Sequence, residues 1–232
     1  MLNNVNLLIF IMIKTKMLLQ NKTEQENRVW GSFVGRFSLT AKQQEQFLSY
    51  LAYLIQENQK FNITAITDFE SIVGDHFTDA LALSEKMDLT ACTSLIDVGT
   101  GGGLPGIPLK IMYPHLQILL IEVNQKKVTF LEEVAVRLGL EDVEVCDLDW
   151  RSFLRGYDQT PDVVIARASL SVEELQRMFK GSSALKHSTL VYWASKYWNA
   201  TQREAQFLDR EESYSVDHKL RRLVFFKDKS GE

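Results

Sequence analysis

The feature that most constrains this chain is a glycine-rich segment over residues 93–106, which reads Thr-Ser-Leu-Ile-Asp-Val-Gly-Thr-Gly-Gly-Gly-Leu-Pro-Gly. The short run 95–98, apolar except for Asp97, has the length and composition of a buried strand and places the glycines at its carboxyl end. Glycines there let the backbone turn sharply and let a ligand approach it, and a following helix presents free N–H groups to an anion. The segment therefore predicts a strand, a ligand-binding loop and a helix in succession.

The spacing of the glycines fits two kinds of ligand. Gly101, Gly103 and Gly106 satisfy the dinucleotide fingerprint G-x-G-x-x-G. The alternative spacing, Asp97-x-Gly99-x-Gly101-x-Gly103, places a carboxylate two residues before the first glycine. A carboxylate at that point would repel a pyrophosphate and would suit an ammonium, such as the amino group of S-adenosylmethionine. We therefore favour an adenosyl ligand over a dinucleotide.

A second acidic residue supports this interpretation. Glu122 ends the next predicted strand, close to the roughly 20-residue offset expected for an acceptor of ribose hydroxyls. Asp97 and Glu122 would then hold the two ends of one adenosyl ligand. The simpler alternative is a glycine-rich turn with a solvated carboxylate beside it.

From residue 94 onward, strand and helix patterns alternate, which is typical of an α/β fold with a mostly parallel sheet. Strands are predicted over 95–98, 117–122, 143–146, 163–166, 189–193, 214–216 and 220–226. Helices are predicted over 106–113, 126–138, 171–179 and 201–208. The last two strands are separated by only a few residues, so we expect them to form a late antiparallel edge of a seven-stranded sheet.

The chain before the glycine segment is predicted to be helical. Thr40 and Gln43 form a capping box, and Asp68 can cap a second helix that extends to about residue 83. We expect a tail over 1–28, either flexible or a start-site extension with Met17 as a plausible start, then a helical cap over 29–90 and a ligand-binding domain over 91–232. The apolar stretch 5–13 is too short to span a bilayer and lacks the features of a signal peptide, so we expect no membrane association.

Charge and cysteine content narrow the possible functions. The net charge is −4 over 232 residues, so any binding to nucleic acid has to use a local basic patch. Cys92 and Cys146 are far apart and lack metal-ligand spacing, which favours reduced thiols in a cytoplasmic protein without a metal site.

Five motifs together resemble the bacterial family of small-subunit ribosomal RNA guanine-N7 methyltransferases, RsmG or GidB, from about residue 43 to the carboxyl terminus. They are residues 97–108, Phe61-Asn62-Ile63-Thr64, His76-Phe77-x-Asp79-Ala80-Leu81, Lys126-Lys127 and Ala166-Arg167-Ala168. The resemblance implies a Rossmann-like S-adenosylmethionine-dependent methyltransferase fold. It also implies methyl transfer to N7 of one guanine in a decoding-region loop of 16S rRNA, with free rRNA or the small ribosomal subunit as partner. We expect the protein to act as a monomer.

The resemblance also implies a set of cofactor contacts. They fall on Gly99, Leu104, Trp150, Arg151 and Arg167, in addition to the loop residues already described. The pair Trp150-Arg151 departs from the family, which commonly has a small or apolar residue followed by an acidic one. Trp150 could still flank an adenine ring, and Asp147 or Asp149 could accept a hydrogen bond from its amino group.

Guanine N7 carries a lone pair and no proton, so the reaction implied by the resemblance requires no general base. Arg167 is then the expected catalytic residue in a positioning role, through a methionine carboxylate or guanine O6. Candidate RNA contacts are Lys126, Lys127, Lys196, Arg203, Arg221 and Arg222. Each could instead be a solvated surface charge. Trp193, Tyr197 and Trp198 surround Lys196, and could stack a base or pack in the core.

Two other classes of function stay open at this point. The same fold could methylate a small molecule or a protein, which the acidic overall charge favours. The loop could also belong to a non-catalytic nucleotide-binding module, including one that binds NAD.

Overall fold

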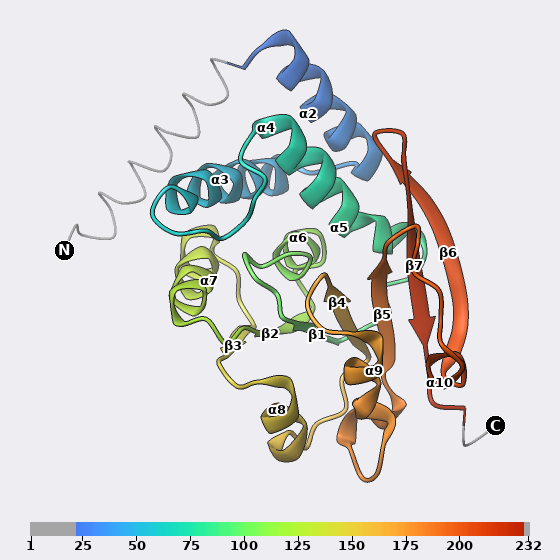
Figure 1. The fold of residues 1–232 in the computed structure, drawn as a ribbon. Coiled ribbons are helices and arrows are strands. Elements are labelled where there is room, and N and C mark those ends of the chain that lie inside the picture. Colours follow the sequence, from blue (N-terminus) through green and yellow to red (C-terminus); the bar gives the residue numbers. More distant parts are fainter. Residues whose placement is uncertain (1–21, 230–232) are drawn as a thin grey trace.

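A computed structural model describes residues 22–229, which form a seven-stranded sheet with helices on both of its faces (Figure 1). The strands are β1 (Ser94–Val98), β2 (Gln117–Ile121), β3 (Val143–Cys146), β4 (Val163–Arg167), β5 (Thr189–Ala194), β6 (Leu208–Val216) and β7 (Lys219–Phe226). Their order in the sheet is β3-β2-β1-β4-β5-β7-β6. The first five are parallel, and β7 is antiparallel to both β5 and β6. The predicted α/β fold with a late antiparallel edge is confirmed.

The helices fall into an amino-terminal group and a group between the strands. The first group contains α2 (Glu24–Phe37), α3 (Ala41–Asn58), α4 (Phe69–Ser71), η1 (Ile72–Thr78), α5 (Asp79–Leu81) and η2 (Ala82–Glu85). The second contains α6 (Gly106–Met112), α7 (Gln125–Leu138), α8 (Trp150–Gly156), α9 (Val172–Leu175), η3 (Gln176–Phe179), η4 (Ala184–His187) and α10 (Gln202–Ala205). The capping box of Thr40 and Gln43 is present at the start of α3, and Asp68 caps α4.

Alternating side chains of the strands divide the core into two clusters. Leu95 of β1 packs on one face with residues of α3, α6 and α7, whereas Ile96 and Val98 pack on the other face with residues of α8 and α9. This division follows from the two-residue period of a strand, which sends successive side chains to opposite faces. Asp97 therefore shares its face with Leu95, on the side of α3 and α6.

The amino-terminal helices cover this first face. α3 contacts α6 and α7, and α5 contacts α6, as Figure 1 also shows. Three phenylalanines and a tyrosine join the helices by ring contacts with centroids 5.0 to 5.5 Å apart: Phe33, Phe47, Phe77 and Tyr50. These helices share one hydrophobic core with the sheet. The domain boundary expected between residues 90 and 91 stays a prediction.

Four elements differ from the sequence expectations. Helix α2 begins at Glu24, inside the segment expected to be a tail, and Thr23 with Glu26 forms a capping box at its start. Helix α8 was not predicted. The helix expected over 201–208 covers only Gln202–Ala205, and β6 begins at Leu208 instead of 214. Four consecutive charged residues in β6, from Asp209 to Glu212, hide the strand alternation because only one side of this edge strand packs.

Two expectations concern the amino terminus and membranes. The stretch 5–13 and the alternative start at Met17 lie outside the described residues. Within residues 22–229, no helix has both the length and the apolar character that a bilayer-crossing segment requires.

Candidate functional site

The glycine loop joins β1 to α6 and is anchored on the end of β2. The N–H groups of Gly99 and Thr100 donate to the carbonyl of Ile121 over 2.9 and 3.1 Å. Gly99 and Gly101 have φ angles of +67° and +61°, which a side chain would strain. A Cβ at Gly99 would lie 2.4 Å from Cβ of Ser169, whereas a Cβ at Gly101 would meet nothing closer than Nζ of Lys127 at 4.0 Å. Gly99 is thus required by packing, and Gly101 faces open space.

Asp97 is fully buried under this loop. Its Oδ2 accepts hydrogen bonds from Oγ1 of Thr100 at 2.6 Å and from the N–H of Gly106 at 2.8 Å. Its Oδ1 is buried and has no hydrogen-bond partner among the described residues. Burial raises the pKa of the Asp97 carboxyl to about 6, despite the hydrogen bonds from Thr100 and Gly106. A buried carboxylate oxygen without a partner is a costly arrangement that a bound cation would relieve.

Glu122 lies at the other end of the loop, directly after β2. Its Oε2 accepts from the N–H of Gly101 at 3.0 Å, and its Oε1 accepts from the N–H of Asn124 at 2.9 Å. Each oxygen keeps further lone-pair capacity, so the carboxylate is held in place and can still accept hydrogen bonds from a ligand. The structure thus places both carboxylates against the glycine loop, Asp97 at Thr100 and Gly106 and Glu122 at Gly101.

The hydroxyl of Tyr50, on α3, donates to the carbonyl of Gly102 and ties the loop to the amino-terminal helices. Gly103, the third left-handed glycine of the loop, leaves no space for a side chain against Ile107 and Leu131. Leu104 is buried below it. The loop is therefore fixed from both sides, as a preformed ligand site requires.

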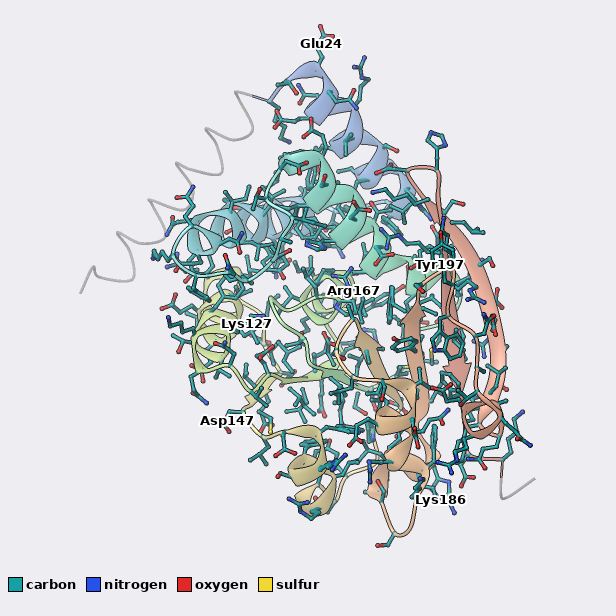
Figure 2. The ribbon with its side chains drawn as sticks, in the orientation of Figure 1. Glu24, Lys127, Asp147, Arg167, Lys186 and Tyr197 are labelled. Atoms are coloured by element: carbon teal, nitrogen blue, oxygen red, sulfur yellow. The ribbon has the colours of Figure 1, made fainter. Side chains whose placement is uncertain are left out.

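Arg167, the last residue of β4, points toward the amino-terminal helices (Figure 2). Its Nη1 donates to Oδ2 of Asp79 at 2.9 Å and to the carbonyl of Asp75 at 3.2 Å. Its Nη2 lies 3.3 Å from Nδ1 of His76, and Nε2 of His76 lies 2.8 Å from Oγ1 of Thr64. Burial, together with the positive charge of Arg167, lowers the pKa of His76 to about 4, so the imidazole is neutral and can accept from Arg167.

The side-chain carboxylates of Asp75 and Asp79 also bind residues of β6 and β7, at the antiparallel edge of the sheet. Oδ1 of Asp79 accepts from the hydroxyl of Tyr214 at 2.7 Å and lies 3.3 Å from Nε of Arg221. Asp75 pairs with Nζ of Lys219 at 2.7 Å and with Nη2 of Arg221 at 2.6 Å. Arg221 is therefore held in ion pairs inside the molecule, and its expected contact with RNA stays a prediction.

Two unusual features occur in the two residues directly after Arg167. Ala168, a residue with a side chain, has a φ of +51°, and Oγ of Ser169 is buried without a hydrogen-bond partner among the described residues. Backbone strain and unpaired buried groups concentrate at functional sites. Ser169 lies against Gly99, at the end of the neighbouring strands β1 and β4.

Trp150 and Arg151 have structural partners at the start of α8. The Trp150 indole is buried in the second core cluster, stacks on Phe153 and donates through Nε1 to the carbonyl of Glu174 at 3.0 Å. The Arg151 guanidinium binds both carboxylate oxygens of Glu174, at 2.6 and 2.8 Å. Those hydrogen bonds hold the pKa of Glu174 well below its ordinary value. These contacts give no support to the expected adenine contacts of the pair.

Two apolar residues that the sequence analysis missed lie at this edge instead. Val123 follows Glu122 and is 59% exposed, and Leu148 follows β3 and is 46% exposed. In the sequence, the signal that could have found them is an apolar residue shortly after a predicted strand, at the edge where ligands bind in this class of fold. Their position at the ends of β2 and β3 suits an apolar ring beside Glu122.

The remaining candidate RNA contacts differ in whether their side chains have partners inside the molecule. Lys126 and Lys127 begin α7, and Lys127 is the cation nearest to Gly101. Arg203 is highly exposed and has only a 3.5 Å contact to Glu173. Arg222 donates to the carbonyls of Ser195 and Trp198 and to Oε2 of Glu211, and its expected contact with RNA stays a prediction.

The aromatic residues around Lys196 have different environments. Trp193 is buried and donates to the carbonyl of Asp79 at 3.1 Å, and Trp198 packs against Tyr192. Tyr197 is 78% exposed, with the ammonium of Lys196 4.8 Å from its ring centroid. Figure 2 shows Arg167 between Lys127 on one side and Tyr197 on the other. Among residues 22–229, no cluster of three or more histidine, cysteine, aspartate or glutamate side chains could hold a metal ion.

Known proteins resemble this chain in sequence and in fold. A ribosomal RNA small subunit methyltransferase G from Aster yellows witches'-broom phytoplasma is 43% identical over 112 residues, which cover 48% of this chain and 53% of that protein. A protein of the same name from Macrococcus caseolyticus is 37% identical over 143 residues, covering 61% of this chain and 60% of that protein. The chain thus spans between half and two thirds of the length of these curated relatives.

A solved structure supports the fold. An S-adenosylmethionine-dependent O-methyltransferase from Thermotoga maritima superposes with a TM-score of 0.50 at 15% identity, over 77% of this chain and 72% of that one. The family model described as rRNA small subunit methyltransferase G, GidB, matches residues 43–226. This range contains the glycine loop, Glu122, Arg167 and the helices that hold them. The chain belongs to the rRNA small subunit methyltransferase G family.

Proposed function

We propose that this protein transfers a methyl group from S-adenosylmethionine to N7 of a guanine in 16S rRNA, as a cytoplasmic monomer acting on free rRNA or on the small ribosomal subunit. The observation that carries the proposal is the family match, which includes every residue of the glycine loop and its two flanking carboxylates. The geometry of that loop supports the methyl donor, and the family description supports the RNA acceptor.

The residues of the loop fit the methyl donor. Oδ1 of Asp97 is buried and unpaired, so it is suited to accept from a ligand ammonium. Glu122 is fixed by two backbone N–H groups and keeps lone pairs for two ribose hydroxyls. Gly101 leaves space for the ligand, and Val123 and Leu148 are suited to the two sides of an adenine ring. Gly99, Gly103 and Leu104 support the loop from below.

The donor supplies a methyl group on a sulfonium, which the lone pair of guanine N7 can take without loss of a proton. No side chain then has to act as a general base, and the protein accelerates the reaction by alignment. Arg167 is suited to this role because the amino-terminal helices hold its guanidinium through three contacts, and a guanidinium has five N–H donors. The donors that are left can bind guanine O6 or the carboxylate of the methyl donor. A single contact to O6 keeps N7 accessible.

Access to N7 constrains the RNA. The major groove of an RNA helix is too deep and narrow for side chains, so the target guanine has to be in a loop or flipped out. Phosphate contacts are proposed for four cations that have no short ion pair among the described residues: Lys126, Lys127, Lys196 and Arg203. They lie on α7, in the turn after β5 and on α10, and they supply positive charge on a chain of net charge −4.

The direct test is transfer of labelled methyl from S-adenosylmethionine to 16S rRNA that lacks this modification, both free and within small subunits. We expect incorporation into one guanine, and we expect Asp97→Ala to abolish it. Failure with both RNA forms, or labelling of a protein or a small molecule in their place, would contradict the proposal.

A further inference from the structure

The turn after β5 presents an aromatic side chain to solvent. Tyr197 is 78% exposed, and it is the one aromatic residue among the large apolar side chains that are clearly exposed within residues 22–229. The ammonium of Lys196 lies over one face of its ring, 4.8 Å from the centroid. This arrangement leaves the other ring face open for a planar partner.

The turn that carries Tyr197 is held firmly at its base. Arg222 donates to the carbonyl of Ser195 at 3.1 Å and to that of Trp198, and it is itself held by Oε2 of Glu211 at 3.0 Å. The Trp198 ring packs edge-on against Phe226 with centroids 6.1 Å apart. Because the backbone on both sides of Tyr197 is fixed, a partner that stacks on the ring has little ordering cost to overcome.

The turn lies at the same edge of the sheet as the proposed active site. Strand β5 pairs in parallel with β4, with Trp193 opposite Arg167, and the turn begins two residues after Trp193. The carboxyl ends of neighbouring parallel strands meet at one edge, which is where ligands bind in this class of fold. Tyr197 therefore lies on the same side as Arg167, as Figure 2 shows.

We propose that Tyr197 and Lys196 form a stacking subsite for an unpaired nucleobase of the RNA substrate, adjacent to the guanine that is methylated. The inference rests on the proposed function, because a guanine that leaves its helix exposes the faces of its neighbours. An aromatic ring stacks on any base, and a cation beside it binds the adjoining phosphate. The neighbouring base stacks on the open face of Tyr197, and the Lys196 ammonium on the other side reaches the backbone.

The test measures the affinity for labelled short single-stranded RNA and the KM for 16S rRNA in parallel. Tyr197→Ala is expected to raise the dissociation constant and the KM about 5- to 150-fold, the range for loss of one base stack. Tyr197→Phe and Tyr197→Trp retain a ring and should stay close to the wild type. Binding of the same strand annealed to its complement should be unchanged in all variants. The affinity for S-adenosylmethionine should also be unchanged.

Matched controls separate stacking from loss of surface area or charge. Val136→Ala removes an apolar side chain that is likewise 78% exposed, near the end of α7, and should alter neither constant. Lys196→Ala should reduce the salt dependence of RNA binding by about 0.7 in the log–log slope, the value for one phosphate contact to a single strand. Arg155→Ala, which removes an exposed cation from α8, should leave that slope unchanged.

The inference is overturned if Tyr197→Ala leaves both the dissociation constant and the KM unchanged, or if Phe and Trp are as harmful as Ala. These outcomes differ from a failure of the proposed function. A protein that prefers single-stranded RNA through Tyr197 but never methylates 16S rRNA would contradict the function alone. A protein that methylates 16S rRNA equally well with alanine at 197 would contradict the stacking subsite alone.

Discussion

Gly101 offers the sharpest separation of ligand binding from folding. Its φ is +61°, and an added Cβ would meet only Nζ of Lys127, at 4.0 Å. Gly101→Ala therefore introduces left-handed strain of roughly 1–2 kcal/mol without a steric clash inside the protein. For a chain of this length, that strain corresponds to a fall in Tm of about 2–8 °C. The loop should keep its shape, because the N–H of residue 101 still donates to Glu122.

The substitution should also weaken the affinity for the ligand. The new methyl group would stand in the space that we assign to S-adenosylmethionine, and overpacking of a filled site costs about 1–3 kcal/mol. That range corresponds to an affinity about 5- to 150-fold weaker. Gly139→Ala is the matched control, because Gly139 has a φ of +59° with nothing within 4 Å and ends α7 away from the loop.

Thermal denaturation and calorimetric titration with S-adenosylmethionine test both parts. The two variants should lose similar stability, and only Gly101→Ala should lose affinity for the donor. Equal affinity of the Gly101→Ala and Gly139→Ala proteins would refute the assignment of this space to the ligand.

Three further predictions address the other residues of the site. The buried Asp97 carboxyl has a pKa of about 6, above its ordinary value of 3.8, and a ligand amino group with a pKa of about 7.7–8 stays protonated below neutral pH. Ionised Asp97 favours that ammonium, so the affinity for the donor, measured by calorimetry, should rise as the pH increases from about 5 to 7. A wild-type affinity that does not change with pH would contradict this role of Asp97, and so would an affinity of the Asp97→Asn variant that still rises with pH. Arg167→Lys keeps the charge but loses the forked geometry, so kcat for methyl transfer should fall about 100-fold; an unchanged kcat would remove Arg167 from the reaction. Trp150→Phe loses the hydrogen bond to Glu174 and should cost about 1 kcal/mol in denaturant unfolding without altering donor affinity; a large loss of affinity would restore Trp150 to the adenine site.

The parts of the site that local sequence determines were predictable. The apolar run around Asp97, the glycines and the strand that ends at Glu122 follow from periodicity and spacing within about 30 residues. Their contacts are backbone hydrogen bonds between neighbouring strands, which parallel pairing imposes once the strands are recognised. The fold class was predictable for the same reason.

Partners that lie far apart in the chain were not predictable. Arg221 has the pattern of a free basic residue, yet Asp75 and Asp79 of the amino-terminal helices neutralise it. Trp150 follows a strand in sequence, but Asp149 caps α8 there, and the cap turns the indole into the core beside Glu174. In both cases tertiary pairing decides the role of the side chain, and one sequence gives no signal of the partner.

The activity proposed for this protein is methyl transfer to guanine N7 in 16S rRNA. Its most direct test is to map N7-methylguanosine at single-nucleotide resolution in 16S rRNA from cells with and without this protein, and after restoring the wild type or the Asp97→Ala variant. We predict one guanine that loses the modification when the protein is absent and regains it with the wild type alone. An identical map in all four samples would contradict the proposed activity.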